Sequence, residues 1–149
     1  MEISWETIKK FDCNPINFNI CRSPDVDLKY KKHVAELEKQ SIDISTHILR
    51  SLFNNDLSVV FSRNEFPYWI EKRVQHIICW IRPNYIEEIE YVREYVDLKC
   101  KQINTENCVI FENLQKNKSV KKINHFHIFA IIPEENIDQF IKTLNEFSP

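Results

Sequence analysis

The chain has 149 residues, 43% of them hydrophobic and 28% charged, a composition typical of one globular domain spanning residues 1–149. Its net charge of −2 gives no general attraction to nucleic acid and so argues against a nucleic-acid partner. There is no apolar run long enough to span a membrane and no export signal, so we expect a cytoplasmic protein, with the nucleus as an alternative.

Glycine is absent from the sequence. Phosphate-binding loops of the P-loop and Rossmann types need glycine where the backbone approaches the phosphate closely, so both are excluded. Turn positions that require a left-handed backbone must be taken by other residues, and we expect Asn and Asp there. The five cysteines include no C-x-x-C pair, which predicts free thiols and argues against a structural zinc site built on cysteines.

The first half of the chain is predicted to form helices. Ser4 can cap a short helical turn over residues 4–11. Ser23, followed by Pro24 and two aspartates, marks the start of a longer helix, because proline and carboxylates both suit the first turn. The predicted apolar stripe of that helix consists of Val26, Tyr30, His33 and Leu37. A third, shorter helix is predicted over residues 45–53.

The second half of the chain is predicted to form strands separated by helices. Four segments are rich in β-branched and aromatic residues and are bounded by Pro, Asn and Lys, as strands usually are. These segments are residues 57–61, 74–82, 107–114 and 123–132. A helix over residues 84–103 is predicted to begin at Asn84, with Glu87 completing a capping box, and a last helix is predicted over residues 133–147.

This order of elements predicts an α+β fold with a helical N-terminal half. The strands are almost continuously apolar rather than strictly alternating, so both faces of the sheet should be covered, or one face should carry a site. We therefore expect a small, mainly antiparallel sheet of about four strands covered by helices. The order of the strands in the sheet does not follow from the pattern.

Four short motifs stand out within these segments: a Pro-Tyr pair, a His-x-x-x-Trp motif, a Phe-Glu-Asn motif, and a serine followed by a His-x-His strand. They consist of Pro67 and Tyr68, His76 and Trp80, Phe111 to Asn113, and Ser119 with His125 and His127. Together with the N-terminal segments, they resemble the fungal N-acetylglucosamine-induced protein 1 family, also known as DUF3605. The resemblance covers nearly the whole chain, and because the function of this family is unknown it implies no substrate or reaction.

His125 and His127 lie one residue apart in the last predicted strand. Successive side chains of a strand alternate between its faces, so both imidazoles should point the same way, about 7 Å apart along the strand. His76 and Glu112 are polar groups within two other apolar strands, where a group without a partner would cost about 1 to 3 kcal/mol. If the three strands are neighbours, the four side chains meet in one site.

Three interpretations of this group remain open. The histidines His76, His125 and His127 could bind a divalent transition metal together with Glu112, and the open position of that cofactor would activate water or substrate. Without a metal, two of the histidines could act as general acid and base, with Glu112 orienting one ring, in the hydrolysis of a phosphodiester or a similar bond. The histidines could also be structural, each hydrogen-bonded within the core.

Five further residues are candidates for ligand binding because of their position near this group. They are Trp80, Tyr68, Asn113, Lys121 and Lys122. The two aromatic residues suit stacking against a sugar or a base, and the two lysines suit a phosphate group. Of the remaining histidines, His33 is expected in the core and His47 on the surface.

We therefore expect a histidine-rich pocket in a small hydrolase, or in a domain that binds phosphate-bearing or sugar-like small molecules. The alternative is a protein-interaction module without catalysis, in which the histidines are structural and the acidic helix over residues 84–103 contacts a partner. No membrane association is expected, and the oligomeric state does not follow from the sequence.

Overall fold

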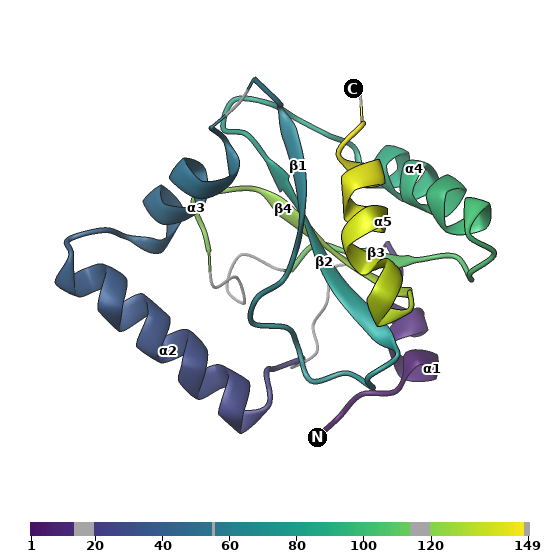
Figure 1. Ribbon diagram of the computed structural model, residues 1–149, viewed down its shortest axis with the longest axis horizontal. Coiled ribbons are helices and arrows are strands. Elements are labelled where there is room, and N and C mark those ends of the chain that lie inside the picture. The colour runs from purple at the N-terminus through teal and green to yellow at the C-terminus, as the bar shows by residue number, and fades with distance from the viewer. Residues whose placement is uncertain (14–19, 55, 114–119, 148–149) are drawn as a thin grey trace.

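The computed structural model describes residues 1–13, 20–54, 56–113 and 120–147 of the chain. A four-stranded sheet lies at its centre, with helices on both faces (Figure 1). The strands are β1 (Val59–Arg63), β2 (Val74–Ile81), β3 (Val109–Phe111) and β4 (His125–Ile131). Their order is β1-β2-β4-β3 and all neighbours are antiparallel, which confirms the predicted α+β fold with a small antiparallel sheet.

The helices precede the sheet and connect its strands. Before β1 come α1 (Trp5–Ile8), the 3-10 turn η1 (Lys9–Phe11), α2 (Pro24–Lys39) and α3 (Ile44–Leu52). After β2 come α4 (Ile89–Gln102), which leads to β3, and then, beyond β4, the 3-10 turn η3 (Glu134–Asn136) and α5 (Ile137–Leu144). No helix in the described part of the chain is long and apolar enough to cross a membrane.

Side-chain caps fix the starts of α2 and α3. Ser23 Oγ accepts a hydrogen bond from the Val26 N–H at 3.4 Å, as predicted for the start of α2. Asp43 Oδ1 accepts a bond from the Thr46 N–H at 2.8 Å, so α3 begins one residue earlier than the sequence pattern indicates. Both helices lie on the same side of the sheet (Figure 1).

The predicted start of α4 at Asn84 is wrong. The Tyr85 N–H donates to Arg82 O at 3.1 Å and closes a β-turn with Pro83 and Asn84 at its centre. Asn84 has a φ of 77°, the left-handed value that the second central residue of a type II turn requires, and proline favours the position before it. The chain therefore turns at Asn84, and the helix begins only after Glu88, its cap residue.

Two other details of the sequence pattern differ from the structure. Ile86 and Ile103, which the pattern places on the buried stripe of α4, lie outside the helix and are 88% and 41% exposed. Left-handed backbone occurs in the described residues at Cys13, Ser41, Asn84 and Asn104. Asparagine thus takes two of these positions as expected, whereas Cys and Ser take the others and Asp takes none.

Helices α4 and α5 cover one face of the sheet (Figure 1). Their apolar side chains pack against alternate residues of β1, β2 and β4, among them Phe61, Ile77 and Ile128, which are at most 1% exposed. Asn145, just after α5, accepts a hydrogen bond from the Phe61 N–H at 2.7 Å and donates to Phe61 O at 2.9 Å. This pair of bonds fixes the end of α5 against the edge strand β1.

The opposite face of the sheet carries two separate apolar clusters. At one end, Trp5 and Ile8 of α1 pack with Phe111 and Phe129. At the other end, apolar side chains of α3 pack against a cluster that includes Ile78. The sheet histidines belong to this second face, where the two clusters meet, so they are held between regions of dense apolar packing.

Candidate functional site

Three histidines lie together on the face of the sheet that α1 and α3 cover. The register of β2 against β4 places His76, His125 and His127 on this face. The ring centroids are 5.1 Å apart for His76 and His127 and 5.3 Å apart for His125 and His127. Each of the three residues is at most 5% exposed. The structure thus brings together three of the four residues of the predicted site.

The segment after β1 carries Tyr68 to these histidines. The Asn64 N–H donates to His76 O at 2.9 Å, and Asn64 Oδ1 accepts a bond from the Phe66 N–H at 2.8 Å, a turn that asparagine favours. After this turn the chain lies over the sheet, and the Tyr68 N–H donates to His76 Nδ1 at 3.1 Å. The Tyr68 ring stacks on His127, with 5.0 Å between the centroids.

A relay of hydrogen bonds connects this backbone amide to His127. Because the Tyr68 N–H can only donate, His76 Nδ1 accepts, and the proton of the neutral His76 ring is on Nε2. His76 Nε2 lies 2.9 Å from His127 Nδ1 and therefore donates to it. His127 Nδ1 is then the acceptor, so the proton of the neutral His127 ring is also on Nε2. One backbone amide thus determines the tautomers of both rings.

The relay ends at a tyrosine hydroxyl and an asparagine amide. His127 Nε2 lies 3.5 Å from Tyr68 Oη and 3.2 Å from Asn113 Nδ2, and Asn113 Nδ2 donates to Tyr68 Oη at 2.7 Å. Two N–H groups cannot bond each other, so the Tyr68 oxygen is the group that accepts from His127. Tyr68 and Asn113, both predicted to bind ligand, are therefore direct neighbours of His127.

Burial keeps His76 and Tyr68 neutral. The pKa of His76 is well below its ordinary value of 6.5, first because burial penalises the charged ring and then because Arg22 and His125 disfavour a further positive charge. Burial also raises the pKa of the Tyr68 phenol, an effect that its hydrogen bond with Asn113 partly opposes. At neutral pH both groups are uncharged, so they act through hydrogen bonds rather than through charge.

His125 is held by a different set of contacts. Its Nδ1 lies 2.8 Å from Ile123 O, and because a carbonyl can only accept, Nδ1 carries a proton. Its ring packs on Trp80, with 4.7 Å between the centroids. The Trp80 Nε1–H donates to Ser62 Oγ at 3.0 Å across β1 and β2. Trp80, which the sequence predicts to bind ligand, is thus fixed beside His125, the first residue of β4.

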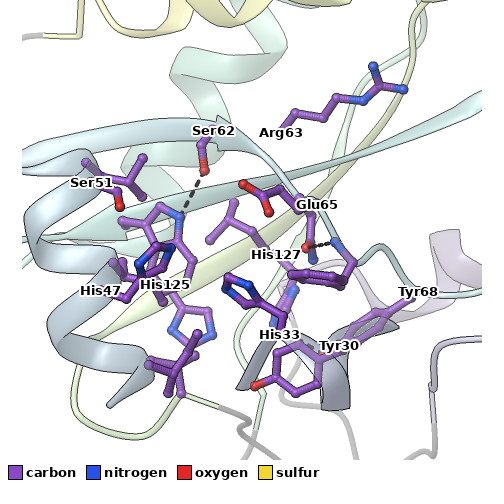
Figure 2. A pocket seen from close by; sticks show the side chains of 18 of the residues that line it. Tyr30, His33, His47, Ser51, Ser62, Arg63, Glu65, Tyr68, His125 and His127 are labelled. Carbon is purple, nitrogen blue, oxygen red and sulfur yellow. Dashed lines mark hydrogen bonds between the residues drawn. The ribbon is translucent and has the colours of Figure 1, made fainter. Parts of the chain in front are cut away.

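These side chains line a pocket of about 180 Å³ between the sheet and helices α2 and α3 (Figure 2). His125 and His127 are in the wall formed by the sheet. His33 of α2 and His47 of α3 are in the wall formed by the helices, with their ring centroids 5.1 Å apart. Both are half-buried there, whereas the sequence pattern places one in the core and the other on the surface. Four of the five histidines of the chain thus line this pocket, and the fifth, His76, is bonded to His127 without lining it.

Arg22 brings a positive charge to the same pocket. Its guanidinium carbon lies 3.9 Å from the centroid of the Tyr30 ring, and its Nε donates to Phe66 O at 3.0 Å. Sequence reasoning missed this residue, because it lies in a segment without periodicity and belongs to none of the motifs. Its position depends on how α2 packs over the sheet, which is a tertiary property.

Glu112, the predicted carboxylate of the site, is not placed with the histidines. Strand β3 ends at Phe111, whose ring contacts His127 with 5.5 Å between the centroids. Alternation along the chain then directs Glu112 to the other face and returns Asn113 to His127. Among the described residues, no group of three or more His, Cys, Asp or Glu side chains is placed to hold a metal ion. The predicted metal set is therefore not assembled there.

The two predicted phosphate-binding lysines also lie away from the pocket. Lys121 and Lys122 are exposed and are not among the residues that line it. Lys122 Nζ lies 3.8 Å from Asp43 Oδ2, the residue that caps α3. Ser119, which belongs to the same sequence motif, lies outside the described residues.

Comparisons with known proteins concern both the sequence and the fold. Residues 4–131 match the profile of a family described as "Protein of unknown function (DUF3605)". The crystal structure of a protein named HTC1 is similar, with a TM-score of 0.60 and 18% sequence identity over 97% of this chain and 94% of that chain. At this identity the likeness concerns the fold alone. A comparison with curated proteins found no match. Because the profile matches most of its length, this chain belongs to the DUF3605 family.

Proposed function

We propose that the protein binds a small phosphate-bearing or sugar-like molecule in the histidine-lined pocket. The observation that carries this proposal is that four of the five histidines line one pocket, although they come from α2, α3 and β4. A buried imidazole costs stability unless its nitrogens find partners, and an apolar side chain in the same place would avoid that cost. A ligand explains such a cluster better than packing does.

The pocket lining includes one carboxylate, Glu65, and several polar groups that suit the same kind of ligand. The contacts of Arg22 with Tyr30 and Phe66 hold a guanidinium in one orientation, which is preorganised for phosphate oxygens. Ser51 and Ser62 add hydroxyl groups to the lining, and hydroxyls can both donate to and accept from a sugar. The apolar part of the lining comes mainly from α3 and the sheet, as is usual for small-molecule sites.

The relay favours binding over acid catalysis at His127. A histidine that acts as a general acid must carry protons on both ring nitrogens before it gives one away. A second proton on His127 would place an N–H at Nδ1 against the N–H of His76, whose Nε2 is 2.9 Å away, and would break the relay. The relay therefore holds the His127 ring in one orientation as part of the pocket wall, which suits binding rather than proton transfer to a substrate.

Isothermal titration calorimetry with inorganic phosphate, glucose, glucose 6-phosphate and ribose 5-phosphate tests this proposal. We expect binding of at least one phosphate-bearing probe. Arg22→Ala should weaken that binding about tenfold or more, because a hydrogen bond to a charged group contributes about 1.5 to 3 kcal/mol. Lys121→Ala is the matched control, since it removes an exposed cation outside the pocket lining, and it should leave the affinity unchanged.

Two results would contradict the proposal. If none of the four probes binds, the pocket has no role in binding such ligands, and the protein-interaction module becomes the better interpretation. If Lys121→Ala weakens binding as much as Arg22→Ala does, the probes bind to surface charge rather than in the pocket.

A further inference from the structure

The wall of the pocket on the sheet side is a continuous row of rings. This sheet row consists of Trp80, His125, His127 and Tyr68, all of which line the pocket. Neighbouring centroids along it are 4.7, 5.3 and 5.0 Å apart, so each ring contacts the next. The row is rigid, because the backbone ladder of β2 and β4 and the relay through His76 hold its members in place.

The wall on the helix side is a second row of rings. This helix row consists of His47, His33, Phe66 and Tyr30, which also line the pocket. Its neighbouring centroids are 5.1, 5.2 and 5.4 Å apart. Arg22 extends the row at its Tyr30 end, since its guanidinium lies over that ring. Residues of β2 and β4 form most of the sheet row and residues of α2 and α3 most of the helix row, and the connection between β1 and β2 adds Tyr68 to the first and Phe66 to the second (Figure 2).

From these two rows we infer that the ligand carries a planar heteroaromatic ring, which stacks between the sheet row and the helix row. The inference rests on the proposed function and narrows its ligand to nucleotide-like molecules. Eight rings around one pocket offer π-faces, which a planar heterocycle uses fully and a saturated sugar ring uses much less. Two of them, His33 and His47, are imidazoles of the helix row, whose ring nitrogens can bond the polar edge of a heterocycle.

The size of the pocket indicates where the part of the ligand outside the planar ring must lie. A cavity of about 150 Å³ holds one benzene molecule, so the volume of about 180 Å³ accommodates one ring system and little more. A sugar phosphate attached to that ring must therefore extend beyond the two rows. The guanidinium of Arg22 is at the Tyr30 end of the helix row, so the phosphate group is expected on that side.

Calorimetric titration of the intact protein with the four common ribonucleoside monophosphates and with ribose 5-phosphate tests this inference. The nucleotides and ribose 5-phosphate share the sugar phosphate and differ in the ring. Stacking of one base is expected to increase affinity about 5- to 150-fold, so at least one nucleotide should bind fivefold or more tightly than ribose 5-phosphate. Equal affinities would overturn the ring inference and leave the proposed function standing. No binding of any of these compounds would overturn the ring inference, and the proposed function would fail with it only if inorganic phosphate, glucose and glucose 6-phosphate also do not bind.

Two substitutions in the helix row locate the binding. Phe66→Leu and Tyr30→Leu remove rings but keep apolar side chains, and each should weaken nucleotide binding about fivefold or more. Phe66→Leu should leave the affinity for ribose 5-phosphate unchanged, whereas Tyr30→Leu should lower it as well, because the Tyr30 ring supports the guanidinium of Arg22. Tyr91→Leu on α4 is the control, because it removes a partly exposed aromatic ring from the opposite side of the sheet. An equal loss in Tyr91→Leu, or no loss in either pocket variant, would overturn the inference.

A fluorescence measurement tests the ring inference without the pocket variants, so its result does not depend on whether those variants fold. Stacking of a nucleotide on the sheet row should quench the emission of Trp80. Trp69→Phe removes a tryptophan that is not among the pocket residues, and this variant should keep the quenching. Loss of the quenching in Trp69→Phe would overturn the inference, as would a short single-stranded oligonucleotide that binds more tightly than any mononucleotide.

Discussion

His76 Nε2 donates to His127 Nδ1 at 2.9 Å, and this bond connects the side chains of the two central strands, β2 and β4, in addition to their backbone ladder. Its direction is fixed because the Tyr68 N–H occupies the other nitrogen of His76. Both rings are almost completely buried. Loss of His76 therefore removes one hydrogen bond from the amide of Tyr68 and one from Nδ1 of His127.

Replacement of His76 by phenylalanine is expected to destabilise the protein by about 2 to 5 kcal/mol, because two buried polar groups each lose a hydrogen bond worth about 1 to 3 kcal/mol. Phenylalanine keeps a flat ring that can stack on Phe129, which lies 4.4 Å from the present ring, so little packing is lost. Equilibrium unfolding in urea measures the change.

Ile78→Val is the matched control for this substitution, since Ile78 is on the same strand and the same face. Removal of one buried methylene should cost about 0.5 to 1.5 kcal/mol. A loss in His76→Phe no larger than that of the control would mean that the relay contributes nothing to stability.

The free energy of unfolding should fall as the pH is lowered below about 6.5. Burial lowers the pKa of folded His76 well below 6.5, whereas the unfolded chain has the ordinary value, so in this range the unfolded state binds more protons. The contribution of His76 to stability is complete above pH 6.5. About 1 kcal/mol of it should be lost between pH 7.5 and pH 5.5.

Urea titrations of the wild type and of His76→Phe at these two pH values isolate the effect. The variant lacks the group that takes up the proton on unfolding, so its stability should change less with pH than that of the wild type. The same pH dependence in both proteins would show that His76 is not responsible for it.

Much of the fold follows from local patterns in the sequence. The His-x-His spacing alone places His125 and His127 on one face, and the caps at Ser4 and Ser23 mark two helix starts correctly. These sequence patterns predict the structure correctly because each depends only on residues a few positions apart along the chain. The start of α4 was misjudged because the sequence after Pro83 suits both a cap and a turn, and the left-handed backbone of Asn84 decides for the turn.

The composition of the site is less accessible from sequence because it depends on register and on layer packing. Glu112 and Asn113 are adjacent, and only the pairing of Phe111 with His127 shows which of them faces the cluster. His33 reaches the pocket because α2 lies over the sheet, a placement that no local pattern determines. His76 Nδ1 accepts from the backbone amide of Tyr68, and because nearly every residue type has such an amide, residue identities do not indicate this contact.

The buried cysteines are expected to be inert in the folded protein. Cys79 is on the opposite face of β2 from His76, and burial raises the pKa of its thiol. Burial also raises the pKa of Cys108, and that of Cys100 to about 12. Because the thiolate is the reactive form, iodoacetamide should modify the exposed Cys21 in the native protein and reach the other three only after unfolding.

Peptide mass spectrometry of native and urea-unfolded samples measures this labelling. The Cys21 peptide serves as the internal control, since it should be labelled in both samples. Labelling of native Cys79 at the rate of Cys21 would contradict the burial of the central strand and would make this thiol a candidate nucleophile.

The turn at Asn84 can be separated from a helix cap by two substitutions. Glycine adopts a left-handed backbone without cost, so Asn84→Gly should keep or slightly raise the melting temperature. Serine is a good cap residue but disfavours this backbone, so Asn84→Ser should lower stability by about 1 kcal/mol, or roughly 2 to 4 °C. If Asn84 were the cap of α4, serine would replace it without loss, because serine and asparagine are about equally good at that position. Thermal unfolding followed by circular dichroism therefore distinguishes the two roles. If Asn84 is a turn residue, the glycine variant melts at a higher temperature than the serine variant, and if it is the cap of α4, it does not.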